Sequence, residues 1–165
     1  ARAPVDRPGG GEHPTADIEG LTMYFASNGE GYLLASSQGS SDYHVYRRDY
    51  VAGSPNAHLG SFSISAGNGI DAVTQTDGIA VANTNLGGQF ASGLFIAHDA
   101  SGDNPTNYKL VPWENVATSY SPGLLVETTW NPRTVPEPST GAIIGYGAML
   151  IAWRRFVIVN RVDGT

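Results

Sequence analysis

The sequence predicts an all-β fold that is built from repeated units, and three observations support this prediction. Glycine and proline are abundant, with 21 and 10 residues in a chain of 165, and charged residues make up only 15%. This composition favours strands and turns over helices. The apolar segments are short and are punctuated by Gly, Asn and Ser, as in antiparallel strands joined by turns. An acidic residue, a glycine and an aliphatic residue also occur together twice, as Glu19-Gly20-Leu21 and Asp77-Gly78-Ile79.

The similarity between the two segments extends beyond this motif. Gly31-Tyr32-Leu33-Leu34-Ala35 matches Gly93-Leu94-Phe95-Ile96-Ala97, and Asp42-Tyr43 matches Asn107-Tyr108. Similar segments that recur after about 60 residues are typical of consecutive units of a β-repeat fold. The pattern also predicts a carboxylate at the same structural position in each unit, which is how a repeat protein can build a shared cation site.

Four strands are expected in the first unit. They cover Leu21 to Phe25, Gly31 to Ser36, Tyr43 to Arg47 and about Leu59 to Ser65. The turn Ser27-Asn28-Gly29 closes the first strand, and short turns of this kind join antiparallel neighbours. Four strands between Asp17 and Ser65 make one complete propeller-type blade. The preceding residues 1 to 16 are rich in proline, glycine and charge and are expected to form a loop.

A second unit starts at Asp77. Strands are expected at Gly78 to Ala82, Leu94 to His98 and Tyr108 to Val111, and a short helical turn at Pro112 to Val116. The sequence leaves the fourth strand of this unit open. Because propellers use about four to eight blades, two blades cannot close a ring. We therefore expect the other blades upstream of Ala1.

The charge and the residue types exclude several classes of function. Fifteen acidic residues against nine basic ones argue against nucleic acid as a partner. Lys109 is the only lysine, so this chain alone cannot line a polyanion channel with lysines, and Arg47-Arg48 is expected to be an exposed strand pair rather than a phosphate contact. The absence of cysteine excludes disulfides and thiolate metal sites, and it is compatible with secretion.

The C-terminal residues differ in character from the rest. Val135 to Thr140 contains Val-Pro-Glu-Pro and leads into an apolar run from Gly141 to Trp153, which Arg154-Arg155 follows. This run is shorter than the roughly 20 residues that a membrane span needs, but a basic pair after an apolar stretch marks a cytoplasmic end. The pattern favours a sorting tail at residues 135–165 over a buried β-hairpin or core helix, and it leaves residues 1–134 as the propeller part.

Several spaced motifs resemble those of the β-propeller phytases. They are Ala16 to Thr22, Gly31 to Gly39, Thr76 to Ile79 and Lys109 to Glu114, with Asn131-Pro132-Arg133 similar to the closing segment of that family. The resemblance covers roughly residues 4 to 133. It implies a six-bladed propeller that hydrolyses phytate, myo-inositol hexakisphosphate, with calcium, and of which this chain forms about the last two blades. The enzyme class that it implies is a 3-phytase-type phosphatase.

Four residues are candidates for a calcium site. Asp17 and Glu19 are two apart, so on one extended strand they point to the same face. Paired carboxylates repel each other unless a cation neutralises them. By resemblance, the positions that bind or support calcium near the phosphate pocket are matched by Asp17, Glu19, Gln38 and Asp77. The three acidic residues would be catalytic through calcium, which neutralises phosphate oxygens while a water attacks phosphorus in line; no covalent residue is implied.

Each of these residues also has a structural interpretation. Acid–glycine pairs are common at β-turns, where the acid binds backbone amides, and a buried Gln38 can simply tie strands together. His98-Asp99 could be a general-base pair, but adjacent strand residues point to opposite faces, which favours a surface or turn role. The other histidines, His13, His44 and His58, lack metal-ligand spacing and are expected to be exposed. Aromatic residues expected in the core or at its rim are Tyr24, Tyr32, Tyr43, Tyr46 and Trp113.

The tail separately resembles the PEP-CTERM sorting signal of Gram-negative bacteria that secrete exopolysaccharide. The match runs from Val135 to Arg155, and the chain departs from the pattern by continuing with Phe156 to Thr165. This resemblance implies a secreted or cell-surface protein, with transient membrane association and sortase-like processing of the tail.

Two functions are compatible with these patterns. The first is calcium-dependent phosphomonoester hydrolysis of phytate or other inositol phosphates within a larger propeller, in which case the isolated chain is expected to show little or no activity. The alternative is a non-catalytic propeller piece that binds calcium or matrix polymers at the cell surface.

Overall fold

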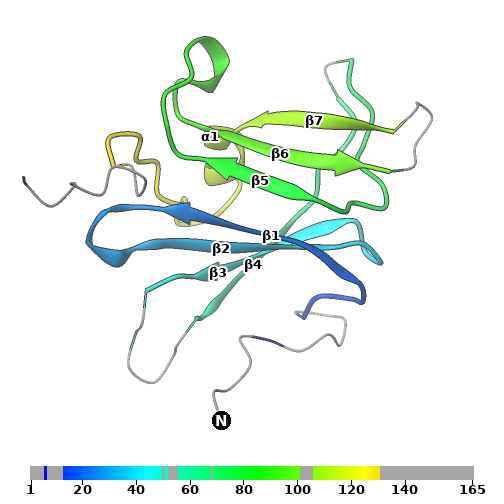
Figure 1. The fold of residues 1–165 in the computed structure, drawn as a ribbon, viewed down its shortest axis with the longest axis horizontal. Coiled ribbons are helices and arrows are strands. Elements are labelled where there is room, and N and C mark those ends of the chain that lie inside the picture. Colours follow the sequence, from blue (N-terminus) through cyan, green and yellow to red (C-terminus); the bar gives the residue numbers. More distant parts are fainter. Residues whose placement is uncertain are drawn as a thin grey trace, which may run out of the picture. The chain divides into compact units, whose positions relative to one another are not determined.

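The computed structural model describes residues 6, 13–49, 51, 56–67, 69–100 and 106–130. All of them belong to the first of two compact units of the chain, residues 1–131. They form two antiparallel sheets that follow one another along the chain (Figure 1), with a single short α-helix among the described residues. The predicted all-β fold of consecutive units is therefore confirmed.

The first sheet has four strands in the order β1-β2-β3-β4, and each is antiparallel to its neighbour. The strands are β1 (Ile18–Phe25), β2 (Gly31–Ser37), β3 (Asp42–Arg47) and β4 (His58–Phe62). This meander confirms the four-stranded unit that the sequence predicts. β1 begins at Ile18 rather than Leu21, because Ile18 already pairs with Ser37 on β2, and β4 ends at Phe62 rather than Ser65.

The second sheet has three strands in the order β5-β6-β7. The strands are β5 (Ile79–Ala82), β6 (Leu94–Asp99) and β7 (Asn107–Pro112), and the helix α1 (Trp113–Thr118) follows directly. The strands and the helical turn lie within two residues of the predicted bounds. No fourth strand of this sheet occurs in the part of the chain that the structure describes. The matched segments of the repeat are equivalent strands, because β2 and β6 are second in their sheets and β3 and β7 are third.

The two sheets meet through their first strands, β1 and β5, which lie side by side in Figure 1. The Val81 amide of β5 donates a hydrogen bond to the Thr22 hydroxyl of β1 (3.2 Å). Just after β5, the Asn83 side chain donates to the Phe25 carbonyl (2.6 Å). Contact between equivalent strands of successive sheets fits the radial repetition of blades in a propeller. The described residues therefore form two neighbouring units of such a repeat.

An aromatic core fills the space between the sheets. Trp113 of α1 is fully buried, and its ring stacks on Tyr24 with 4.4 Å between the centroids. Its indole N–H donates to the Leu125 carbonyl (2.8 Å), so the large apolar ring also has its polar atom satisfied. Tyr43 and Phe95 meet edge to face at 5.0 Å. The aromatic residues expected in the core or at its rim are all buried: Tyr24, Tyr32, Tyr43, Tyr46 and Trp113.

Two residues that the sequence predicts at the surface are buried, and a third, His58, is half-buried. The sequence predicts an exposed His44, but this residue is 1% exposed, because β3 is an inner strand and Nδ1 of His44 lies 3.0 Å from Nε2 of His58. The sequence also favours a surface role for Asp99, which is 2% exposed because the Lys109 ammonium lies 3.1 Å from its Oδ2 and neutralises it. The side chain of His13 is 61% exposed, as predicted.

Several predictions fall on parts of the chain that the structure does not describe. They are the closing segment Asn131-Pro132-Arg133, the sorting tail at residues 135–165 and most of the loop at residues 1–16. Within the described ranges, no helix is long and apolar enough to cross a bilayer.

Hydrogen bonds to Glu127 connect the segment after α1 to the first sheet. The Glu127 carboxylate accepts hydrogen bonds from the Ser27 backbone amide and from the Ser27 hydroxyl, both at 3.0 Å. These two bonds, the amide first, lower the pKa of the Glu127 carboxyl. A carboxyl whose pKa falls on folding stabilises the folded state above its unfolded pKa of roughly 4.3. This contribution is lost as the pH falls through the lower folded value.

We therefore expect Glu127→Gln to lower the melting temperature near neutral pH and to reduce the loss of stability between about pH 5 and pH 3. Thermal unfolding across this range measures both effects. Glu114→Gln is the matched control, because Glu114 is exposed on α1 and accepts a long hydrogen bond from the Ser92 hydroxyl (3.3 Å). This control should follow the wild-type pH profile, and a Glu127→Gln profile that also runs parallel to wild type would contradict the stabilising role of Glu127.

Candidate functional site

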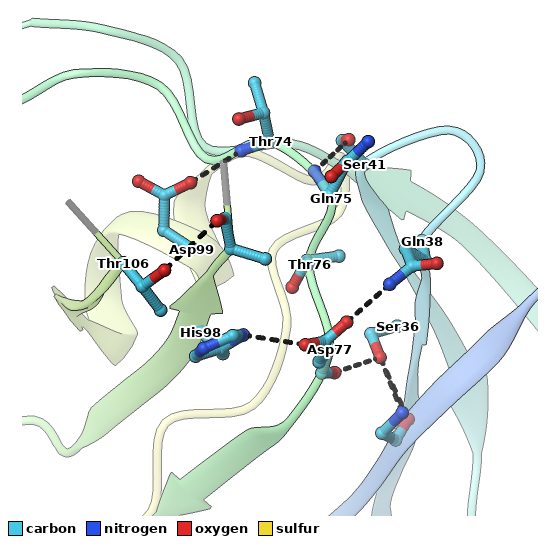
Figure 2. Close-up of polar contacts among 12 residues, drawn as sticks. Ser36, Gln38, Ser41, Thr74, Gln75, Thr76, Asp77, His98, Asp99 and Thr106 are labelled. Atoms are coloured by element: carbon cyan, nitrogen blue, oxygen red, sulfur yellow. Dashed lines mark hydrogen bonds and ion pairs between the residues drawn. The ribbon is translucent and has the colours of Figure 1, made fainter. Parts of the chain in front are cut away.

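The candidate site centres on Asp77, which lies just before β5 (Figure 2). Its carboxylate meets side chains from both sheets. The side-chain amide of Gln38, just after β2, donates to Oδ1 of Asp77 (2.6 Å). His98 of β6 lies on the other side, with its Nδ1 3.0 Å from Oδ2. The Asp77 side chain is 39% exposed, so it remains open to water and to ligands although each of its oxygens has a nitrogen neighbour.

Hydrogen bonds also hold the backbone of Asp77. The Ser36 hydroxyl donates to the Asp77 carbonyl (2.6 Å) and accepts from the Gly20 amide (2.7 Å). A Cβ atom on Gly20 would lie 2.6 Å from that carbonyl oxygen, so β1 passes in direct contact with it. The two copies of the acid–glycine motif, which the sequence predicts to be equivalent, therefore meet at Ser36.

Two buried groups fix the segment that leads to Asp77. The Tyr43 hydroxyl donates to the Thr76 hydroxyl (3.0 Å). Burial raises the pKa of Tyr43 to about 12, so the phenol stays protonated as the donor. On the other side of the segment, the Asp99 carboxylate accepts a hydrogen bond from the Thr74 amide (3.0 Å), as Figure 2 shows. Tyr43 comes from the first sheet and Asp99 from the second, so both sheets position this segment.

Lys109 is buried and pairs with Asp99, the residue that holds the Thr74 amide. Its ammonium donates to Asp71 (2.5 Å) and to the side-chain oxygen of Asn107 (2.8 Å), and it lies 3.1 Å from the Asp99 carboxylate. The hydrogen bond to Asp71 raises the pKa of Lys109, so the ammonium carries its charge at neutral pH. The one lysine of the chain is thus paired with two carboxylates, those of Asp71 and Asp99.

The first copy of the motif reaches the site through its backbone. The Asp17 carbonyl accepts a hydrogen bond from the Gln38 amide (2.9 Å). Asp17 and Glu19 are both exposed. The register of β1 against β2 shifts between Ile18 and Leu21. The prediction that both acidic side chains point to the same face assumes a regular alternation along the strand. Such a bulge interrupts this alternation.

The structure brings two of the four predicted calcium ligands, Gln38 and Asp77, into contact. Calcium takes about six to eight oxygen ligands, and the site offers the Asp77 carboxylate beside the Gln38 side-chain amide. Among the residues that the structure describes, no three His, Cys, Asp or Glu side chains lie close enough together to hold a metal ion. A cation at this place would take further oxygens from water or phosphate, to which Asp77 is open. The residues whose roles as metal ligands stay predictions are Asp17, Glu19, Gln38 and Asp77.

The structure places His98, for which the sequence favours a surface or turn role, against Asp77. The repeat in the sequence could have predicted this position of His98. Gly93 to Ala97 matches Gly31 to Ala35, so His98 is equivalent to Ser36. Both residues contact Asp77, one at the carboxylate and the other at the carbonyl.

A separate pocket lies at the other end of the first sheet. It has a volume of about 430 Å³, and its walls include Tyr32, Arg47, His58 and Tyr120. β2 runs from this pocket to the Asp77 site, so the two places lie at opposite ends of that strand. The Arg47 side chain is 42% exposed, as predicted, and it is paired with Asp49 (2.6 Å). Because its charge is already neutralised, this pocket lacks the positive charge that a phosphate site needs.

Comparisons with known proteins agree with this architecture. The sequence model of the family described as phytase matches residues 1–137, and that of the PEP-CTERM protein-sorting motif matches residues 134–155. The 3-phytase of Bacillus subtilis (strain 168) is 41% identical over 136 residues, which are 79% of this chain and 35% of that protein. The chain thus spans about a third of the length of this curated relative. With a family match over most of the chain and two successive β-sheet units in the structure, the chain belongs to the phytase family, whose fold is a β-propeller.

Proposed function

We propose that this chain forms part of a calcium-dependent phytase, which hydrolyses phosphomonoesters of phytate, myo-inositol hexakisphosphate. Membership of the phytase family supports the substrate class, and the similar 3-phytase supports the reaction. The structural observation that carries the proposal is the meeting of both acid–glycine motifs at Asp77, beside Gln38. The proposed calcium ligands are Asp17, Glu19, Gln38 and Asp77, and the three acidic residues are catalytic through the metal.

The charge of the chain supports a role for a cation. The chain has a formal net charge of −6, so on its own it repels a substrate that carries several phosphates. Calcium would supply the positive charge that stabilises the phosphate oxygens during the reaction. The contribution of the protein is positioning: Gln38 holds the Asp77 carboxylate and Ser36 holds the Asp77 carbonyl. A carboxylate fixed in this way does not have to reorganise when charge develops near it.

We also propose that the tail directs export. The PEP-CTERM motif at residues 134–155 supports a location in the cell envelope or at the surface of a Gram-negative bacterium. In this proposal residues 1–134 form the propeller part, and residues 135–165 associate transiently with the membrane before sortase-like processing.

Calcium titration of the full chain, followed by thermal unfolding, tests the metal site. A ligand that binds only the folded state adds about 2.7 kcal/mol of stability at a free concentration of roughly 100 times its Kd. We expect calcium to raise the melting temperature of the wild type, and we expect Asp77→Asn and Glu19→Gln to lose this rise. Asp49→Asn is the matched control, because Asp49 pairs with Arg47 at the far end of the sheet. A rise of equal size in all variants would exclude this site.

Phosphate release from phytate, measured with the same variants, tests the reaction. We expect little or no release by the isolated chain, because its only lysine is buried in an ion pair and Arg47 is paired as well. In a propeller that contains this chain, we expect calcium-dependent release that Asp77→Asn abolishes. Release that survives Asp77→Asn would contradict the role of Asp77. Calcium binding by that propeller without any phosphate release would favour the alternative, a non-catalytic calcium-binding propeller piece.

A further inference from the structure

The pocket of about 430 Å³ at the other end of the first sheet has no role in the proposed function. Its walls come from the start of β2, the end of β3, the start of β4 and the segment after α1. This volume lies within the range of about 300–1,000 Å³ that is typical of pockets for small molecules. The first sheet therefore offers space for a ligand away from Asp77.

The Tyr32 hydroxyl brings an unused hydrogen-bond donor to the wall of this pocket. Tyr32 is 7% exposed, and its hydroxyl oxygen accepts a hydrogen bond from the Leu125 amide (2.8 Å). Burial raises the pKa of Tyr32, so the hydroxyl keeps its proton at neutral pH. None of the described residues accepts this proton in a hydrogen bond. Because buried polar groups are nearly always hydrogen-bonded, an oxygen atom of a bound ligand would supply the missing acceptor.

Arg47 and Asp49 supply both donors and acceptors at the pocket. Nε and Nη2 of Arg47 donate to the two carboxylate oxygens of Asp49, at 3.0 Å and 2.6 Å. These bonds leave further N–H groups on the guanidinium and further lone pairs on the carboxylate. Both side chains are partly exposed, at 42% and 23%, so these groups can reach a ligand. A hydroxyl group is donor and acceptor at once, so adjacent hydroxyls of a ligand match this pair.

Apolar side chains form much of the remaining wall. Leu59 and Leu125 line the pocket and are 38% and 40% exposed. Tyr120 and Pro122 add two rings to the lining. Apolar surface of this kind gains stability when C–H groups of a ligand displace water from it.

We propose that this pocket binds a neutral ring polyol, which is a sugar unit or an inositol ring without phosphates. Such a ring carries hydroxyls at its edge and C–H groups on its faces, and the lining offers polar partners and apolar surface to match. The carboxylates of Glu30 and Asp49 outnumber the guanidinium of Arg47 in the lining, so its charge disfavours the phosphates of phytate. The inference goes beyond the proposed function, because it needs neither calcium nor Asp77.

Saturation-transfer NMR of the full chain without calcium tests this pocket. The probes are myo-inositol and the methyl glycosides of glucose, galactose and mannose. We expect saturation transfer to ring protons of a probe. We expect Tyr32→Phe and Asp49→Asn each to raise the dissociation constant about two- to tenfold, as the loss of one hydrogen bond does. Tyr108→Phe is the matched control, because Tyr108 lies on β7 outside the pocket and is 64% exposed. This control should keep the wild-type affinity.

The probes also separate the two sources of the ring. Binding of myo-inositol alone would identify the dephosphorylated ring as the ligand, and binding of a glycoside alone would identify a sugar unit. No transfer to any probe, or equal dissociation constants of wild type, Tyr32→Phe and Asp49→Asn, would overturn the inference. Displacement of the bound probe by phytate without calcium would contradict the preference for neutral ligands. Melting curves establish whether Tyr32→Phe folds, and Asp49→Asn decides the test if it does not.

The Asp77→Asn variant separates this inference from the proposed function. Asp77 lies at the opposite end of β2 from the pocket, so this variant should lose the calcium response and keep the wild-type affinity for the ring. A chain that binds the ring without responding to calcium would support the inference and overturn the calcium proposal. A chain that responds to calcium without binding any probe would do the reverse.

Discussion

Replacing Lys109 with methionine is expected to lower the free energy of unfolding by about 3–5 kcal/mol. The Lys109 side chain is 5% exposed, and its ammonium lies 3.1 Å from Asp99, whose side chain is 2% exposed. Removing one partner of a buried ion pair leaves the other charge without compensation, which is the cause of this large cost. Asp71 loses its ammonium donor as well. Methionine keeps an unbranched apolar chain in the same space, so the charge is the main change.

Urea denaturation of the purified variants measures this effect. Arg47→Met is the matched control, because Arg47 also pairs with an aspartate but has a side chain that is 42% exposed. Exposed pairs of this kind contribute little to stability, because water and salt screen them. The double variant Lys109→Met/Asp99→Asn should recover part of the loss, since it removes the uncompensated charge. Equal costs for Lys109→Met and Arg47→Met would show that the buried pair contributes no more than the exposed one.

The strands could be predicted because their signals are local. Short apolar and aromatic runs between turn residues mark β2 and β3, and the repeat identifies β6 and β7 as their equivalents. The start of β1 could not be predicted in this way. The local sequence at Ile18 and Glu19 indicates an acid–glycine turn. The strand includes these residues because Ile18 pairs with Ser37 across the sheet.

The candidate site could be predicted only in part. The resemblance to phytases places Gln38 and Asp77 near one site, and the structure shows them in contact. The burial of Asp99 could not be predicted, because it depends on Lys109, and nothing local in the sequence links the two residues. Charged residues are rarely buried unless they are paired. An acidic residue is therefore predicted to be exposed unless its counter-ion is known. The contact of His98 with Asp77 could have been predicted, because the repeat makes His98 equivalent to Ser36, which contacts the same aspartate.

Gly20→Ala is expected to destabilise the protein by roughly 1–3 kcal/mol and to weaken its response to calcium. A Cβ atom at this position would lie 2.6 Å from the Asp77 carbonyl oxygen, 2.9 Å from the Ile79 amide nitrogen and 2.9 Å from the Ser36 hydroxyl oxygen. Two of these atoms belong to the backbone and cannot rotate away, so β1 and β5 have to separate. Because Ser36 bridges Gly20 and Asp77, the displacement acts directly on the candidate site.

The repeat itself provides the matched control, Gly78→Ala. Gly78 occupies the same place in the second motif as Gly20 does in the first, but none of the described atoms would lie within 4 Å of its added Cβ. We expect this change to alter the free energy of unfolding by less than about 0.5 kcal/mol and to leave the calcium response unchanged. Urea denaturation and calcium titration of both variants make the comparison. If the two changes cost the same, the loss belongs to the motif in general and not to the contact between β1 and β5, and the two motifs do not build one site through that contact.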